Sequence, residues 1–210
     1  QIDALSTTQI RALTTAQIGA LTDAQLDEFE TDDIKALTNA QISKMSTSQI
    51  AGLSDTQLQA FTTAQIPALT SSQISNLAPA QLAAFTTDQL KALTATQIKA
   101  LTGDQIDAIG TTDFALLTST QIAALTTSQL DTFDAGQIAG LETSQIKGLT
   151  VAQIKSLDAT QIAAIETEDL ELFTAAQIAA FTTDQVPVLS AAQIDALSTT
   201  QIRALTTAQI

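Results

Sequence analysis

Hydrophobic residues recur along this 210-residue chain in a pattern that repeats every eight residues. We letter each octad a to h from its first residue. Slot a is Gln in 24 of 27 octads and Asp in three, namely Asp33, Asp113 and Asp169. Slots b and e are always hydrophobic, slot d is mostly Ala or Gly, slots f and g are most often Thr, and slots c and h vary. The period has no insertion or deletion, so we interpret residues 1–210 as a single continuous repeat array.

Three local structures compete for this pattern. A continuous α-helix would let the hydrophobic stripe drift by about 80° per octad, which leaves no polar face after a few octads. A β-solenoid keeps its phase, but slots b and e would then point to opposite faces of the strand. One short helix per octad places both slots on the same side. We therefore expect an all-α solenoid of very short helices, with a β-solenoid as the alternative fold.

The residues from slot e to the next slot b form a capping box with a hydrophobic staple. In the run from Leu13 to Ile18, Thr14 is the expected N-cap, and its hydroxyl accepts a hydrogen bond from the N3 amide. Gln17 at N3 reaches back to the Thr14 amide, and Leu13 packs on Ile18. This arrangement predicts a helix of about six or seven residues in each octad.

Charged residues are sorted along the octad as a helix dipole favours. Fifteen of the 22 acidic residues lie in slots f, g, h and a, which form the expected N-cap and first turn. Seven of the eight basic residues lie in slot c, near the expected C-terminus. Pro79 in slot g suits the first helical position. Pro67 and Pro187 in slot c remove an amide donor late in the helix, so we expect those two helices to be shortened.

Helices this short are unstable alone, because isolated helices below roughly 12–15 residues are marginal in water. The octads must therefore stack on one another. Slots b and e should form a continuous inner seam, the small residue in slot d should let helices approach closely, and slots c and h should face outward. Either two or three octads complete one turn of the solenoid, and the pattern is compatible with both.

Composition narrows the possible chemistry. The chain contains no His or Cys, so it lacks the usual general base, a thiol nucleophile and the commonest zinc ligands. We therefore expect no enzymatic activity and assign no catalytic, cofactor-binding or metal-ligating residue. The net charge of −14 opposes binding to nucleic acid or to an anionic membrane. No apolar run approaches the roughly 18 residues of a membrane span, so we expect no membrane insertion.

Two acidic clusters are the strongest candidates for a binding site, with Ca²⁺ as the candidate ligand. One comprises Asp27, Glu28, Glu30, Asp32 and Asp33, and the other comprises Glu166, Glu168, Asp169 and Glu171. Neither has the spacing or the glycine of an EF-hand loop. A solvated face that caps helix N-termini accounts for both clusters, and helix capping likewise accounts for the Thr rows that could suggest a recognition surface.

A longer period overlies the octads. Residues 1–18 and 193–210 are identical, which is an offset of 192 residues or 24 octads. We interpret residues 1–192 as one long repeat and residues 193–210 as the start of the next copy. Both ends also fall inside a repeat, so we expect the array to continue end to end, within a longer chain or through self-association.

The run ALTTAQI at residues 12–18, within the wider pattern QIxALTTxQIxAL, resembles the octapeptide-repeat regions of very large bacterial exported or surface proteins. This resemblance covers the whole chain. It implies an extracellular or cell-surface spacer, stalk, adhesin shaft or filament, and it assigns no catalytic residue. The second hypothesis is a repeat-based module that binds cations, glycans or a surface through its acidic and Thr-rich flank.

Overall fold

Short helices, one in nearly every octad, make up the computed structural model of the chain, which describes residue 2 and residues 4–210. Gln1, the first residue of the expected array, lies outside the described residues. No β-strand occurs in the described part of the chain, so the all-α prediction is confirmed and the β-solenoid alternative is wrong. The chain forms two compact units, residues 1–109 and 110–210.

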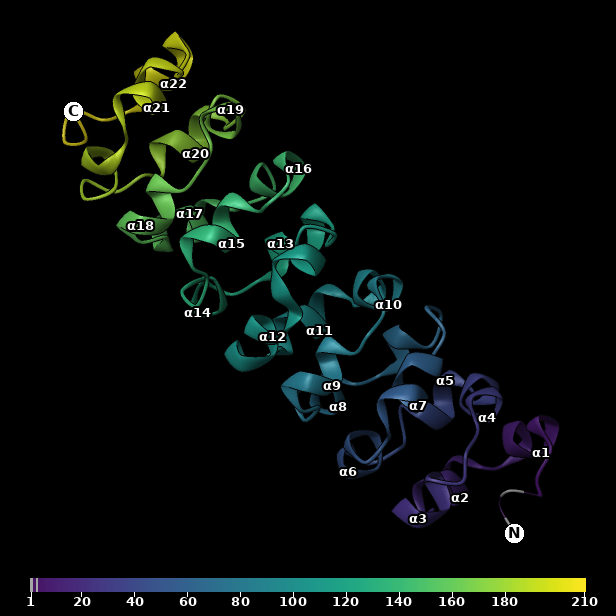
Figure 1. Cartoon of the computed structure of the whole chain (residues 1–210). Helices are drawn as coiled ribbons and strands as arrows, with labels where there is room; N and C mark the ends of the chain where they lie inside the picture. Colours follow the sequence, from purple (N-terminus) through teal and green to yellow (C-terminus); the bar gives the residue numbers. More distant parts are fainter. Residues whose placement is uncertain (1, 3) are drawn as a thin grey trace. The chain divides into compact units, whose positions relative to one another are not determined.

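The first unit contains the helices from α1 to α11 and most of α12 (Figure 1). Their bounds are α1 Thr7–Ala12, α2 Thr15–Gly19, α3 Asp23–Leu26, α4 Thr31–Ala36, α5 Asn39–Ile42, α6 Thr47–Ala51, α7 Asp55–Ala60, the 3-10 helix η1 Ile66–Ala68, α8 Ser71–Ser75, α9 Pro79–Ala83, α10 Thr87–Ala92, α11 Ala95–Ala100 and α12 Gly103–Phe114. The helix α12 consists of two helices joined at Gly110, whose backbone is not helical (φ 73°, ψ 157°).

The second unit begins at Gly110 and repeats the same construction. Its further helices are α13 Ser119–Ala124, α14 Thr127–Leu130, α15 Ala135–Ala139, α16 Thr143–Ile146, α17 Val151–Ser156, α18 Ala159–Ala163, α19 Thr167–Leu170, α20 Ala175–Ala179, the 3-10 helix η2 Val186–Val188, α21 Ala191–Asp195 and α22 Thr199–Ala204.

Apart from the merged α12, these α-helices are four to six residues long. The six-residue helices, such as α1 and α4, have the expected length, and the others are one or two residues shorter. The backbone of the slot-e residue ends each helix. Leu13 adopts extended backbone angles (φ −59°, ψ 139°), and its amide donates to the Ile10 carbonyl at 3.2 Å. This tight closing turn directs the chain into the next N-cap after a single helical turn or little more.

The proline predictions are confirmed. Pro67 and Pro187 lie in the three-residue 3-10 helices η1 and η2, where the regular octads have α-helices. The missing amide of a proline in slot c cannot close the last α-helical bond, so only a shorter turn forms. Pro79 occupies the first position of α9, where no amide donor is needed.

Each unit is a solenoid in which three octads, or 24 residues, complete one turn. Helices pack on the third helix before and the third helix after in the octad order, as in the series α1, α4 and α7 of the first unit (Figure 1). The second unit shows the same spacing, with α13 on α16 and α14 on α17. This result decides between the two alternatives that the sequence left open.

The hydrophobic core is the expected seam of slots b and e. Slot-b residues such as Ile10, Ile34 and Leu58 are fully buried, and their slot-e neighbours Leu37 and Phe61 are 3% and 2% exposed. Slots c and h are mostly exposed, so the outward face is also as predicted. Because every octad contributes the same two positions, the core continues from turn to turn within each unit.

Candidate functional site

The slot-a glutamine, with the hydroxyl residue three positions earlier, forms the predicted capping box. The Thr14 amide donates to Gln17 Oε1 at 2.8 Å, and the Gln17 amide donates to Thr14 Oγ1 at 3.2 Å. The same pair of bonds starts most helices of both units, including those capped by Asp134 and Asp158. The side-chain oxygen of the glutamine, Oε1, is thereby used within its own helix.

The amide nitrogen of the same glutamine has a second role that the sequence analysis missed. In α17, Gln153 Nε2 donates to the carbonyls of Ile122 and Leu125, both at 2.8 Å. These acceptors lie 31 and 28 residues earlier, at the C-terminal end of α13, which directly precedes the helix α14 on which α17 packs. The glutamine therefore bridges two turns of the solenoid.

This bridge recurs throughout both units, and we call it the glutamine ladder. Each member donates to the carbonyl of a slot-e residue 28 residues earlier and to a second carbonyl 30 or 31 residues earlier. The members with described bonds are Gln41, Gln49, Gln57, Gln65, Gln73, Gln81, Gln89, Gln97, Gln105, Gln145, Gln153, Gln161, Gln177, Gln185, Gln193, Gln201 and Gln209.

Only a primary amide can form both the cap and the bridge. Gln153 is 2% exposed, and it needs one acceptor oxygen for the cap and a nitrogen with two N–H groups for the bridge. No buried side-chain nitrogen or oxygen in the described part of the chain lacks a partner. The bridge also satisfies slot-e carbonyls, which the short helices leave without an internal donor.

A signal for this second role was present in the sequence. Glu serves the capping box as well as Gln does, and the helix dipole favours a carboxylate in the first turn. Slot a nevertheless contains no Glu in any of the 27 octads. The absence of Glu, with Asp in only three octads, indicates that slot a generally donates hydrogen bonds, which a carboxylate cannot do.

Small residues in slot d permit the close approach of successive turns, as expected. A Cβ atom on Gly148 would lie 3.0 Å from Ser119 Cβ and 3.1 Å from the Ser119 carbonyl oxygen. Gly148 follows α16, and Ser119 opens α13, the helix on which α16 packs. The short separation between turns allows a side chain as short as Gln to span them.

The slot-a aspartates interrupt the ladder. Asp169 is 5% exposed, and its side chain is one methylene shorter than Gln and has no N–H group. By the register of its neighbours, it faces the carbonyls of Ile138 and Leu141, and the Leu141 carbonyl accepts no hydrogen bond among the described residues. Asp33 retains only the cap, through a 3.1 Å bond from the Glu30 amide to its Oδ2 atom.

The first acidic cluster does not come together into a metal site. Asp27 and Glu30 line an open hollow of about 390 Å³ beside the hydroxyls of Ser54 and Thr56. Asp32 instead forms an exposed 3.0 Å ion pair with Lys35.

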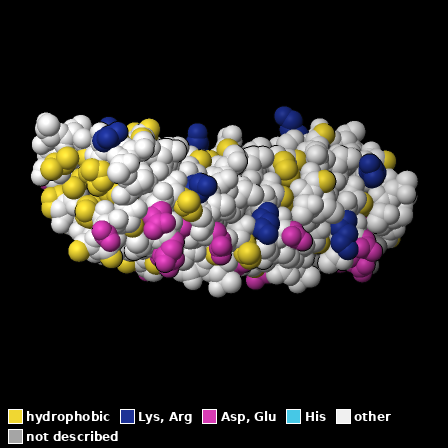
Figure 2. All heavy atoms as spheres, turned by 90° about the horizontal axis from the view of Figure 1, so that it is seen from above, with side chains coloured by type: hydrophobic (Ala, Val, Ile, Leu, Met, Phe, Trp, Pro, Cys, Tyr) yellow, Lys and Arg dark blue, Asp and Glu magenta, His cyan; other side chains and the backbone are white. Residues whose placement is uncertain are grey.

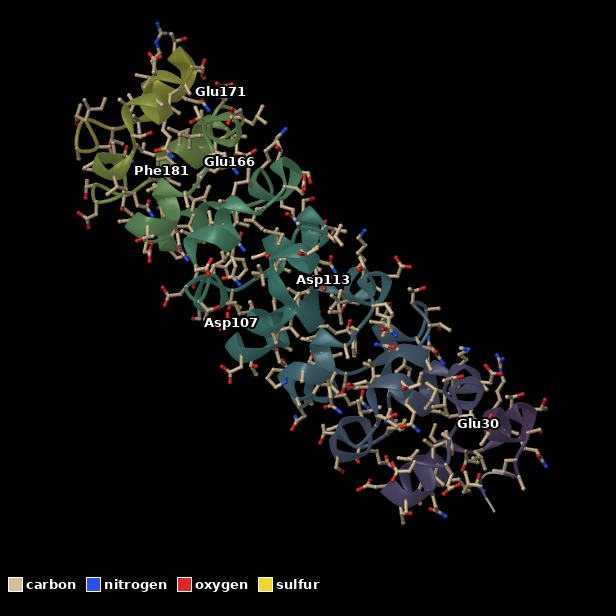
Figure 3. The ribbon with its side chains drawn as sticks, viewed as in Figure 1. Glu30, Asp107, Asp113, Glu166, Glu171 and Phe181 are labelled. Carbon is tan, nitrogen blue, oxygen red and sulfur yellow. The ribbon has the colours of Figure 1, made fainter. Side chains whose placement is uncertain are left out.

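The second acidic cluster is also dispersed. Glu166 and Glu171 lie at opposite ends of α19 (Figure 3). Among the described residues, no three carboxylates of either cluster gather so as to hold a metal ion. On the face seen in Figure 2, Lys and Arg side chains lie apart from one another and form no continuous basic patch.

The aromatic residues belong to the core. Phe133 packs edge-on against Phe114, with ring centroids 4.8 Å apart, and Phe173 lies 6.2 Å from Phe181. All four rings are at most 4% exposed, so they line no binding surface. No described helix is long and apolar enough to cross a bilayer.

The ALTTAQ repeat family model matches residues 1–28, 26–63, 74–111, 106–143 and 162–199. The chain belongs to the ALTTAQ repeat family. No curated protein matches it. The six letters of the ALTTAQ repeat correspond to slots d to a, for example from Ala12 to Gln17. They therefore comprise the small contact residue, the inner hydrophobic residue, the N-cap with its first turn, and the ladder glutamine.

Proposed function

We propose that this ALTTAQ array is a structural module that sets length and rigidity in a filament, stalk or other extended protein of a bacterial cell surface. The glutamine ladder is the observation that supports this function. Within each unit, successive turns are joined by the same pair of buried hydrogen bonds as well as by the hydrophobic seam. A structure whose neighbouring turns make equivalent contacts is extended by adding further turns.

The remaining chemistry favours the same proposal. The chain has no His or Cys, and no three of its described carboxylates gather in one place, so we assign it no catalytic role. Its buried polar groups are used for holding turns together rather than for presenting reactive atoms. The extracellular or cell-surface location rests on the resemblance of the octad to the repeats of very large exported bacterial proteins.

Concatenated chains test the length-setting role. Residues 1–192 are joined in one, two and three copies, which preserves the phase because 192 is a whole multiple of the 24-residue turn. We expect small-angle X-ray scattering to give a constant cross-section and a maximum dimension that grows by an equal increment per copy. Copies that collapse into a particle of growing cross-section would contradict the proposal.

A calcium titration separates this function from the binding-module hypothesis. A structural module should unfold at the same temperature with and without millimolar calcium, since no three described carboxylates lie close enough together to hold a metal ion. A rise in unfolding temperature at micromolar calcium, lost in the variant Glu166→Gln with Glu168→Gln, would instead favour a cation-binding module.

A further inference from the structure

The octad of α19 contains a buried carboxylate that forms no hydrogen bond among the described residues. Asp169, its slot-a residue, is 5% exposed. The slot-a carboxylate of Asp33 accepts the Glu30 amide in its own cap at 3.1 Å, but the equivalent Glu166 amide donates no described bond to Asp169. Buried charges in proteins are paired or coordinate a metal ion. The Asp169 carboxylate therefore requires a partner from outside its own helix.

The backbone opposite this carboxylate offers more oxygen atoms and no donor. In the preceding octad, Gln161 Nε2 lies 2.8 Å from each of two carbonyl oxygens of an earlier turn. The same register places Asp169 opposite the carbonyls of Ile138 and Leu141. The Leu141 carbonyl accepts no described hydrogen bond, and the Ile138 carbonyl accepts one only from the Leu141 amide. Three oxygen-bearing groups thus surround the position that an amide nitrogen holds in the regular octads.

The step between turns is also wider at this octad. Slot d is mostly Ala or Gly, but here it is Leu172, and α19 packs less closely on α16 than α16 packs on α13. The site is accessible as well. No described side-chain oxygen is both fully enclosed and without a partner, so the unpaired Asp169 carboxylate can be reached by a small solute.

The surrounding charges favour a cation as the partner. Residues 156–202 contain no Lys or Arg, and the preceding Lys147 is exposed and forms no ion pair among the described residues. The exposed carboxylates of Glu166 and Glu171 flank the site at the two ends of α19 (Figure 3). Surface charge of one sign raises the local concentration of ions of opposite sign.

We infer that Asp169, together with the carbonyls of Ile138 and Leu141, binds a monovalent cation of the size of potassium. The ion takes the place of the ladder nitrogen and holds the two turns together through oxygen ligands. Potassium channels bind K⁺ with backbone carbonyl oxygens in the same way. The inference goes beyond the proposed function, because it adds a ligand that is part of the array itself.

Size and charge both favour a monovalent ion over calcium. Calcium binds oxygen ligands at about 2.3–2.6 Å, which is shorter than the 2.8 Å from Gln161 Nε2 to its carbonyls. One positive charge also balances the one buried carboxylate, whereas a divalent ion would leave an uncompensated charge at a buried position.

Thermal unfolding of the 210-residue chain in potassium, sodium and choline chloride at equal ionic strength tests the site. The variant Asp169→Asn removes the charge at nearly constant size, and Asp169→Gln restores the amide of the ladder. The matched control is Glu171→Gln, which removes an exposed carboxylate from the same octad.

We expect the wild-type chain and the Glu171→Gln control to unfold about 2–4 °C higher in about 150 mM potassium than in choline, with a smaller rise in sodium. The unfolding temperatures of Asp169→Asn and Asp169→Gln should be the same in potassium and in choline. Crystals grown in rubidium chloride should show an anomalous scattering peak between the Asp169 carboxylate and the Leu141 carbonyl, because rubidium replaces potassium.

Several results would overturn the potassium site. These are equal unfolding temperatures of the wild-type chain in potassium and choline, an equal potassium effect in Asp169→Asn, the absence of a rubidium peak, and stabilisation by calcium in place of potassium. The length-setting proposal would survive each of them, because the scattering of concatenated chains does not depend on a bound ion.

Discussion

The variant Gln153→Glu gives the sharpest test of the ladder, because capping and bridging predict opposite results. A carboxylate at the third position of α17 still accepts the Thr150 amide and interacts favourably with the helix dipole. If capping were its only role, the substitution would be neutral or slightly stabilising. The bridge predicts a large loss of stability instead.

The magnitude follows from the two bonds that disappear. Gln153 Nε2 lies 2.8 Å from two carbonyl oxygens, and each bond contributes about 0.5–1.5 kcal/mol. The substitution also places a carboxylate oxygen against these carbonyls at a site that is 2% exposed. An unpaired buried charge costs about 3–5 kcal/mol when its partner is removed. We therefore expect Gln153→Glu to lower the free energy of unfolding by about 3–5 kcal/mol.

Urea denaturation followed by circular dichroism measures this loss, and Gln17→Glu is the matched control. Gln17 has the same capping bonds but no inter-turn bond, and it is exposed, so its substitution should change stability by less than about 0.5 kcal/mol. Equal effects of the two substitutions would refute the bridging role.

The deficit of Gln153→Glu should also depend on pH. The facing carbonyls raise the pKa of the introduced carboxyl group above its unfolded value, because they disfavour the charged form. The loss of stability should therefore be complete above the folded-state pKa and should shrink as the pH falls through it, when the protonated group can donate one bond. A deficit that is independent of pH would show that the group remains charged or has moved into solvent.

Three further experiments test other parts of the fold. Asp169→Gln should raise the free energy of unfolding by about 1–2 kcal/mol, because it supplies the missing bridge; an unchanged urea midpoint would contradict the register assigned to this octad. Gly110→Ala should cost about 1–2 kcal/mol from its φ of 73° alone, since an added Cβ meets no atom within 4 Å. Gly19→Ala, at a helical position, should be neutral or stabilising, and thermal unfolding of both variants measures the difference. Equal losses of stability in the two variants would rule out backbone strain at Gly110 as the cause. Ile106→Asp should lower the free energy of unfolding by more than about 3 kcal/mol, because it buries an unpaired charge. Lys99→Ala, at an exposed position, should change it by less than about 0.5 kcal/mol. Similar effects of the two substitutions would show that slots b and e do not form the buried seam.

The local structure of each octad could be predicted from sequence because it depends on neighbours only a few residues apart. Thr14, Gln17 and Ile18 contain the whole capping box within one helical turn, and the buried slots follow from the same period. The shortened helices at Pro67 and Pro187 also follow from a local cause, the missing amide donor.

The number of octads per turn could not be predicted in the same way. Turns of two or three octads both bury slots b and e, so the hydrophobic pattern does not distinguish them. The glutamine ladder distinguishes them, but its acceptors lie 28 to 31 residues away, as for Gln153 with Ile122 and Leu125. The capping box already explained the presence of Gln, and only the absence of Glu from slot a indicated a second partner.

The direction of the ladder also governs the order in which the protein can fold during synthesis. Each glutamine of the ladder uses acceptors that the ribosome made 28 to 31 residues earlier, and it needs none from residues not yet made. A newly synthesised octad therefore finds its docking surface already complete. Domains generally fold from the N-terminus during synthesis, at about 5–20 residues per second. A growing chain of this kind can add one short helix at a time, with no more than its latest turn exposed to premature association.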